Sequence, residues 1–268
     1  MNTRLLTRAS LVVLAVLTGL YLVAPVFIVI PTAFSDSSFL AFPPEEWSLR
    51  WFSSYFEDPT WISATVSSLR IGVLVTMCSV VLGTLAALAM VRGRYPLRVF
   101  VGGLVLAPVL VPYVVIGLAV YALFLRIGLT QTTLGFVLVH TSLAVPFVVI
   151  NVSSALVSFD RRLEMAAMSL GANRLSTFLR VTLPLIAPSM AAGALFAFIT
   201  SFDEVVTSIF LAGPDLTTLP VQMWSGVRVQ IDPTVAAVST MMLLVTLSLF
   251  AAAGIARAAR NRRLNRSL

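Results

Sequence analysis

The sequence predicts an all-α integral membrane protein with six transmembrane helices, and three observations support this fold class. Apolar residues make up 59% of the 268 residues and charged residues only 11%, whereas an ordinary soluble domain carries roughly 25% charge. Several apolar stretches reach the roughly 20 residues with which a helix crosses a ~30 Å hydrocarbon layer. Basic residues gather in alternate connections between these stretches. The lipid bilayer is therefore the expected surroundings of this chain.

Windows of apolar residues, separated by charged or Pro/Gly-rich segments, place the six spans near residues 10–31, 69–91, 99–125, 133–156, 187–211 and 233–256. Arg4 and Arg8 precede the first span, as they would in a signal peptide. Its length exceeds the 7–15 apolar residues of such a peptide, and no A-x-A site follows, so we expect an uncleaved anchor. With core spans at about 69–256 and no visible internal repeat, residues 1–268 are expected to form one transmembrane domain.

The arginines predict the orientation of the chain. With the N-terminus in the cytoplasm, the outer segments hold only Arg50, Arg126 and Arg228, while Arg70 sits at an outer helix edge. The inner segments then hold Arg4, Arg8, Arg92, Arg94, Arg98, Arg161, Arg162, Arg174, Arg180, Arg257, Arg260, Arg262, Arg263 and Arg266. The positive-inside rule therefore predicts a multi-pass membrane protein with both termini cytoplasmic.

The residue types that are scarce exclude several kinds of chemistry. The sequence contains no lysine, so it has no G-x-x-x-x-G-K-[ST] loop, and ATP hydrolysis would require another polypeptide. Cys78 and His140 are each the only residue of their type, and neither can build a metal site alone. We expect His140 to be a hydrogen-bonded packing residue. The net charge of +7 is explained by topology, and we expect no binding of nucleic acid.

Residues that interrupt helices mark a candidate solute pathway. The third span contains Pro108 and Pro112, which remove backbone hydrogen bonds in a place where lipid supplies no replacement. Such breaks indicate either a watery path or close helix packing, and both interpretations stay open. Asp203 and Glu204 are the only adjacent carboxylates within an expected span. They would line the path of a cationic solute or pair with a neighbouring helix.

The longest inner connection, residues 157–186, has a helical pattern of its own. Asp160 is placed to cap a helix and Gly171 to end it. Between them, apolar residues recur on one helix face, at Leu163, Ala166, Ala167 and Leu170. This pattern predicts an amphipathic helix of about three turns. Its alanines leave a low surface that suits the groove of another protein, although a helix lying on the membrane is an equal alternative on this pattern alone. A second short segment, Leu175–Val181, is expected to stop before Leu183-Pro184, where the proline breaks the helix ahead of the fifth span.

A motif in this connection resembles a known family. Glu164, Ala166, Ala167, Gly171 and the pair Leu183-Pro184 resemble the E-A-A-x-x-x-G-x(9)-I-x-L-P signature of permease subunits in ATP-binding-cassette (ABC) importers. Aligned on Gly171, the consensus glutamate position holds Met165. Glu164 lies one residue earlier, roughly 100° around a helix. The resemblance implies that this segment is a coupling helix that docks onto an ATPase.

The resemblance extends from about residue 11 to 256. The segments 201–206, 213–214, 219–220 and 231–233 look like the spermidine/putrescine-type branch of these permeases. It implies the type I ABC importer permease fold in the bacterial inner membrane, with a coupling helix between the fourth and fifth spans. It also implies four kinds of partner: a second homologous permease subunit, two cytoplasmic ATPases that bind ATP and Mg, an extracytoplasmic solute-binding protein and the lipid bilayer. This chain itself is expected to bind no cofactor.

The predicted function is therefore that of a transport subunit rather than an enzyme, one that supplies half of the pathway for a small polar solute such as a polyamine or a related organic cation. The alternative is an ion-coupled secondary transporter that works alone. That class normally has coupling groups near mid-membrane and an internal repeat. This chain offers one acidic pair, Asp203 and Glu204, in the outer half of a span.

Overall fold

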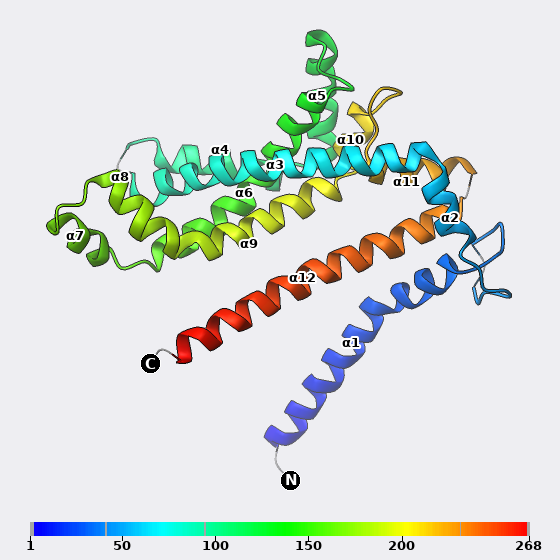
Figure 1. The fold of residues 1–268 in the computed structure, drawn as a ribbon, viewed down its shortest axis with the longest axis horizontal. Coiled ribbons are helices and arrows are strands. Elements are labelled where there is room, and N and C mark those ends of the chain that lie inside the picture. The colour runs from blue at the N-terminus through cyan, green and yellow to red at the C-terminus, as the bar shows by residue number, and fades with distance from the viewer. Residues whose placement is uncertain (1–2, 41, 94, 231, 267–268) are drawn as a thin grey trace. The chain divides into compact units, whose positions relative to one another are not determined.

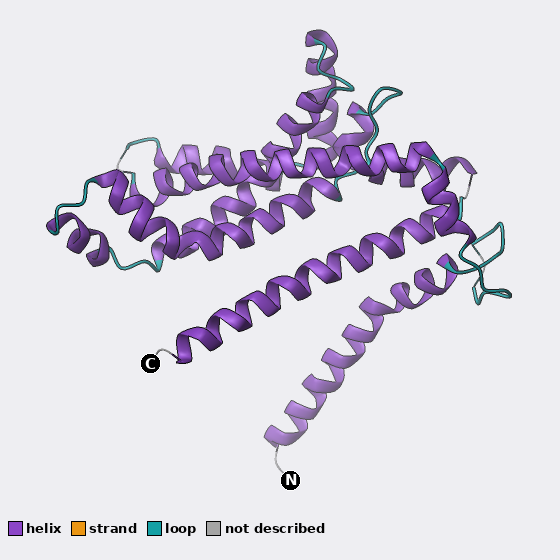
Figure 2. Cartoon of the chain, in the orientation of Figure 1, coloured by secondary structure: helices purple, strands orange, loops and turns teal. Residues whose placement is uncertain are grey.

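The computed structural model describes residues 3–40, 42–93, 95–230 and 232–266. Within these residues the regular elements are helices, and β structure is limited to two isolated bridges, Ser35 with Trp47 and Gly213 with Leu216 (Figure 2). The all-α fold class is confirmed. Two residues used in the sequence argument, Arg94 and Ile231, lie outside the described part.

The chain divides into two compact units. The first comprises Met1–Ile62 and Met223–Leu268. Its elements are α1 (Thr3–Ala33), α2 (Arg50–Glu57), η2 (Gly226–Gln230, a π-helical turn) and α12 (Thr234–Arg266). α12 packs against both α1 and α2, around a small core of Ala33, Trp51, Ala236 and Ala237. The most apolar window of α1 has no buried residues, as suits a helix that faces lipid.

The second unit, Ser63–Gln222, holds the larger core. Its elements are most of α3 (Pro59–Arg92), then α4 (Arg98–Leu110), α5 (Tyr113–Ile127), α6 (Thr133–Val157), α7 (Arg162–Ser169), α8 (Arg174–Thr177), η1 (Phe178–Thr182, π-helical), α9 (Leu183–Phe202), α10 (Val206–Leu211) and the start of α11 (Leu219–Ser225). α6 is the central helix and packs lengthwise against α9 (Figure 1).

Glycines allow α3 and α9 to approach α6 closely. Val148 of α6 is fully buried, and Gly83 of α3 and Gly193 of α9 both lie against it. A Cβ added at Gly83 would lie 2.6 Å from the Val148 Cβ, and one added at Gly193 would lie 3.0 Å from the Val148 Cα. In a bilayer, where helices gain little from burying apolar surface, such close contact is a main source of association.

The helices account for most of the expected spans. Four are long and apolar enough to cross a membrane, at Ser10–Ala33, Pro59–Arg92, Thr133–Val157 and Arg174–Phe202. α4 and α5 form a fifth if they are taken together, and the shorter apolar helix Thr234–Ser248 lies where the sixth was expected. The described chain is thus consistent in order with six spans, and the count of six stays a prediction.

The expected third span, 99–125, is not one continuous helix. α4 ends at Leu110 and α5 begins at Tyr113, with a bend of 102° between their axes. Pro112 causes this break, because it has no N–H and forces the preceding residue out of the helical region. Val111 accordingly has an extended ψ of 131°. Pro108, by contrast, stays within α4.

The expected fifth span, 187–211, differs at both ends. The helix that covers most of it runs from Arg174 to Phe202, so the predicted stop at Leu183-Pro184 is wrong. A π-helical turn absorbs this proline, since the Leu183 N–H bonds five residues back to the Phe178 carbonyl. At the other end the chain breaks at residues 203–205 and resumes as α10. Asp203 and Glu204 therefore lie in a break between two helices.

We predict that Gly83→Ala destabilises the protein, because its new Cβ would overlap Val148, which is fully buried and cannot move aside. Overpacking of this kind costs about 1–3 kcal/mol, and it should appear as a lower midpoint of thermal denaturation in detergent. Gly103→Ala is the matched control, because nothing lies within 4 Å of its added Cβ. Equal midpoints for the two variants would contradict the close packing described here.

Candidate functional site

The predicted helix of the inner connection forms as α7, with the expected stop and a start one residue later. The Asp160 carboxylate accepts a hydrogen bond from the Arg162 N–H at 2.9 Å, which satisfies a free donor of the first turn. Gly171 has a φ of +92°, a conformation in which a side chain is strained. Its N–H bonds to the Met168 carbonyl, and the Ala172 N–H to that of Ala167. These two bonds form a Schellman motif, so α7 ends after 8 residues, about two turns rather than three.

One side of α7 carries large apolar side chains that the described chain leaves exposed. Leu163 and Met165 are each exposed by more than two fifths, and Leu170, directly after the helix, by 89%. Ala166 is also exposed, whereas Ala167 is half-buried. No residue of α7 is fully buried. This short helix therefore presents an apolar surface with a low point at Ala166, the kind of surface that another protein covers.

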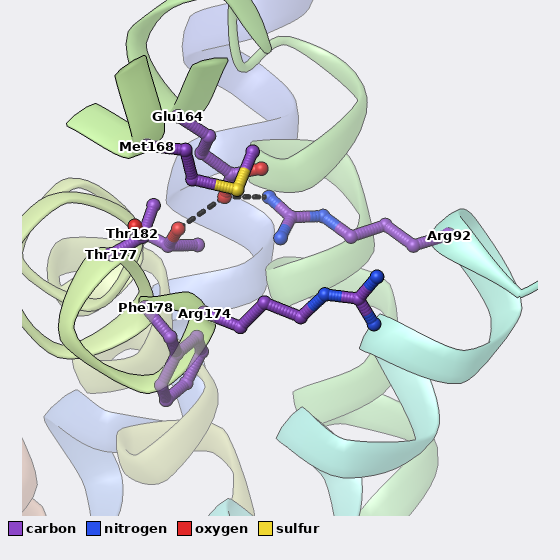
Figure 3. A pocket seen from close by; sticks show the side chains of 7 residues that line it. All are labelled: Arg92, Glu164, Met168, Arg174, Thr177, Phe178 and Thr182. Carbon is purple, nitrogen blue, oxygen red and sulfur yellow. Dashed lines mark hydrogen bonds and ion pairs between the residues drawn. The ribbon is translucent and has the colours of Figure 1, made fainter. Parts of the chain in front are cut away.

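The other side of α7 faces a cavity of about 240 Å³, in which Glu164 is held by two partners (Figure 3). Arg92, at the end of α3, places its Nη2 2.8 Å from the Glu164 Oε1. The Thr182 hydroxyl, in the π-helical turn, donates a hydrogen bond to the same oxygen. Arg174, Thr177 and Phe178 complete the lining together with Met168. The acidic residue of the motif is thus engaged inside its own chain.

A second polar cluster holds the break between α9 and α10. Glu204 is buried, and its two carboxylate oxygens accept four hydrogen bonds, from the backbone and hydroxyl groups of Thr207 and Ser208 at 2.7–3.0 Å. These bonds satisfy the first donors of α10. Asp203, its neighbour in sequence, is exposed. The structure therefore separates the acidic pair into a buried, fully bonded member and an exposed one.

His140 of α6 joins this cluster. Its Nδ1 lies 3.0 Å from the Ser201 hydroxyl of α9, and its Nε2 lies 3.1 Å from the Ser208 hydroxyl of α10. The same nitrogen is 3.6 Å from a Glu204 oxygen. The prediction that His140 is a hydrogen-bonded packing residue is confirmed. It ties together the two helices on either side of the break.

α5, which follows the break at Pro112, packs closely against α10, which follows the break at Asp203 and Glu204. Gly117 of α5 lies against Phe210 and the backbone of Thr207, with no room for a Cβ. Pro112, which begins α5, is exposed, and Pro108 of α4 is half-buried. The second unit thus has two interrupted helices that pack together through their later segments.

Sequence reasoning missed several partners in both clusters. Arg92 was used only as a topology signal, and Thr182 received no role. Ser201 and Ser208 lie seven residues apart, which would place them on one face of a continuous helix. Here a break separates them, so spacing alone could not have paired both with His140.

The comparisons with known proteins decide the family. The model of the binding-protein-dependent transport system inner membrane component matches residues 79–264. The chain belongs to this family. It is the permease subunit of a binding-protein-dependent ABC importer, a multi-pass protein of the inner membrane, and its role is transport rather than enzymatic catalysis.

Relatives of this permease have similar lengths. It is 31% identical over 227 residues to the spermidine/putrescine transport system permease protein PotC of Escherichia coli (strain K12), an alignment that covers 85% of this chain and 86% of that protein. It is 33% identical over 251 residues to the putrescine transport system permease protein PotI of the same strain, covering 91% and 89%.

Solved structures show that the permease shares its fold with ABC transporters. A bacterial ABC transporter involved in the import of the acidic polysaccharide alginate matches with a TM-score of 0.72 at 15% identity, over 93% of this chain and 95% of that one. The alginate transporter in complex with an alginate pentasaccharide-bound periplasmic protein matches with a TM-score of 0.70 at 18% identity, over 92% of each chain.

We predict that substitution of the two neighbouring acids affects stability unequally. Glu204→Gln replaces one carboxylate oxygen with an amide NH2, which cannot accept hydrogen bonds from Thr207 and Ser208. Each buried donor left without an acceptor costs about 1–3 kcal/mol. The thermal midpoint of this variant in detergent should fall clearly. Asp203→Asn changes an exposed residue and should leave the midpoint unchanged. A permease in which Asp203→Asn were the more damaging substitution would not have the arrangement described here.

Proposed function

We propose that this permease subunit provides half of the transport pathway for a cationic, polyamine-like solute. Two relatives that align along most of the chain are named for spermidine and putrescine transport. Both compounds are flexible polycations, so a pathway that carries them needs acidic or polar groups that face water. The solute assignment depends on whether this chain offers such a group.

Asp203 is the observation that carries the solute proposal. It is an exposed carboxylate at a break between two apolar helices. An ionisable group at membrane depth is costly unless it faces protein or water, and broken helices in transporters commonly form solute sites. Glu204 serves a different purpose in this proposal, because its oxygens are already occupied and hold the break in shape. The exposed breaker Pro112 is assigned to the same pathway, with Pro108 close behind it in α4.

The exposed apolar side of α7 is the basis for assigning ATP hydrolysis to a separate subunit. We propose that its apolar side, including Leu163, Met165 and Leu170, docks onto a cytoplasmic ABC ATPase that binds ATP and Mg. Two such ATPases, a second permease subunit and an extracytoplasmic solute-binding protein would complete the importer. This arrangement requires α7 to face the cytoplasm, with both chain termini on the same side, which agrees with the distribution of arginines.

The docking proposal is tested at Ala166, the low point of the exposed side of α7. Ala166→Trp adds bulk at a contact that should leave no room for it, and such changes at the centre of an interface can cost 2 kcal/mol or more, roughly 30-fold in affinity. We expect the ATPase to be lost from the purified complex while membrane insertion stays normal. Ala166→Ser, which keeps the residue small, is the control and should retain the ATPase. Full retention by the tryptophan variant would favour a helix that only lies on the membrane.

The solute proposal is tested at Asp203 with radiolabelled putrescine as the probe. Removing a charged hydrogen-bond acceptor typically costs about 1.5–3 kcal/mol, or roughly 10- to 100-fold. Asp203→Asn should therefore reduce putrescine uptake by at least about tenfold, and Asp203→Glu should restore part of it. Asp215→Asn removes another exposed acid and serves as the control. Unchanged uptake in Asp203→Asn, or no putrescine uptake by the unmodified importer, would refute the solute assignment.

A further inference from the structure

We infer that Glu164 is an internal tie that fixes α7 to the end of α3, and that it is not a contact of the ATPase. The inference rests on the proposed docking of α7 and adds a second role to that helix. α7 would bind the ATPase with one side and hold α3 with the other. Arg92 and Thr182 are the positioning partners of Glu164 in this tie.

The direction of the Glu164 side chain is the first argument. The Glu164 side chain is only 16% exposed, whereas the neighbouring residue Met165, which occupies the consensus glutamate position, is 54% exposed as a whole. Adjacent residues of a helix point roughly 100° apart, so a shift of one position moves a carboxylate from the outward side to the inward side. The departure from the motif therefore exchanges an outward acid for an inward one.

The partners of Glu164 are the second argument, because they come from two different elements. Arg92 reaches it from the last residue of α3, and the fully buried Thr182 reaches it from η1 (Figure 3). The arginine also places its guanidinium carbon 5.5 Å from the ring centre of Phe159, which precedes α7. A single side chain of α3 thus contacts both the approach to α7 and α7 itself.

The ion pair between Glu164 and Arg92 joins two helices, α7 and α3, that are far apart in the sequence. Covalently, α7 is joined only to α6 on one side and to α8 and η1 on the other. α3 lies far earlier in the sequence and would receive no displacement of α7 through the backbone. The packing of Gly83 on Val148 couples α3 to α6, and the ion pair adds a direct connection from α7, so a movement that the ATPase imposes on α7 reaches the end of α3 without passing through α6.

Charge exchange tests the tie in the purified permease without an ATPase or a solute. Glu164→Arg and Arg92→Glu should each lower the thermal midpoint, because each leaves two like charges facing one another. The double variant should recover at least half of the loss. Arg162→Gln, which removes another charge from α7, is the matched control and should have little effect. Additive losses in the double variant would overturn the inference.

Milder variants in the assembled importer separate a tie from a docking contact. Glu164→Gln and Arg92→Gln should each retain the ATPase at the wild-type level in co-purification, yet lower putrescine uptake several-fold. A tie predicts the same phenotype from both residues, since either change removes the same ion pair. Loss of the ATPase from Glu164→Gln alone would show that Glu164 contacts the ATPase and would overturn the inference. The Ala166 variants report on docking separately, so failure of the tie and failure of docking are distinguishable.

Discussion

Backbone hydrogen bonding is the constraint on which the rest of this structure depends. In hydrocarbon no water replaces a lost N–H···O=C bond, so every interruption of a membrane helix needs a substitute from the protein itself. The permease uses a different substitute at two such sites. Glu204 supplies carboxylate oxygens to the first donors of α10, and at Leu183-Pro184 the helix widens into a π-helical turn.

These substitutes also decide where the functional groups lie. Because Glu204 turns inward to hold α10, Asp203 is left exposed at the same break. His140 strengthens the arrangement, since its two ring nitrogens face serines on either side of the interruption. Asp203 thus has a defined position at the break, because Glu204 beside it holds the start of α10 through hydrogen bonds.

The sequence predicted features that depend on local chemistry, and it failed where long-range contacts decide. Apolar windows located the helices, Gly171 marked the end of α7, and the E-A-A-like motif identified the family that the comparisons then confirmed. The path through Pro184 was mispredicted, because a proline alone does not reveal whether a π-helical turn will absorb it. The pairing of Glu164 with Arg92 could not be predicted, since no pattern relates residues so far apart in sequence.

The π-helical turn at residues 178–182 has a mechanical consequence. Because the helix does not stop there, one rod of 29 residues runs from Arg174, just after α7, to Phe202, just before Asp203. Its length is about 43 Å at 1.5 Å per residue, and tilting such a rod about one end by about 5° swings the other end by about 4 Å. A small rotation of this helix at the end next to α7 therefore displaces the end next to Asp203 by a distance comparable to the diameter of an ion.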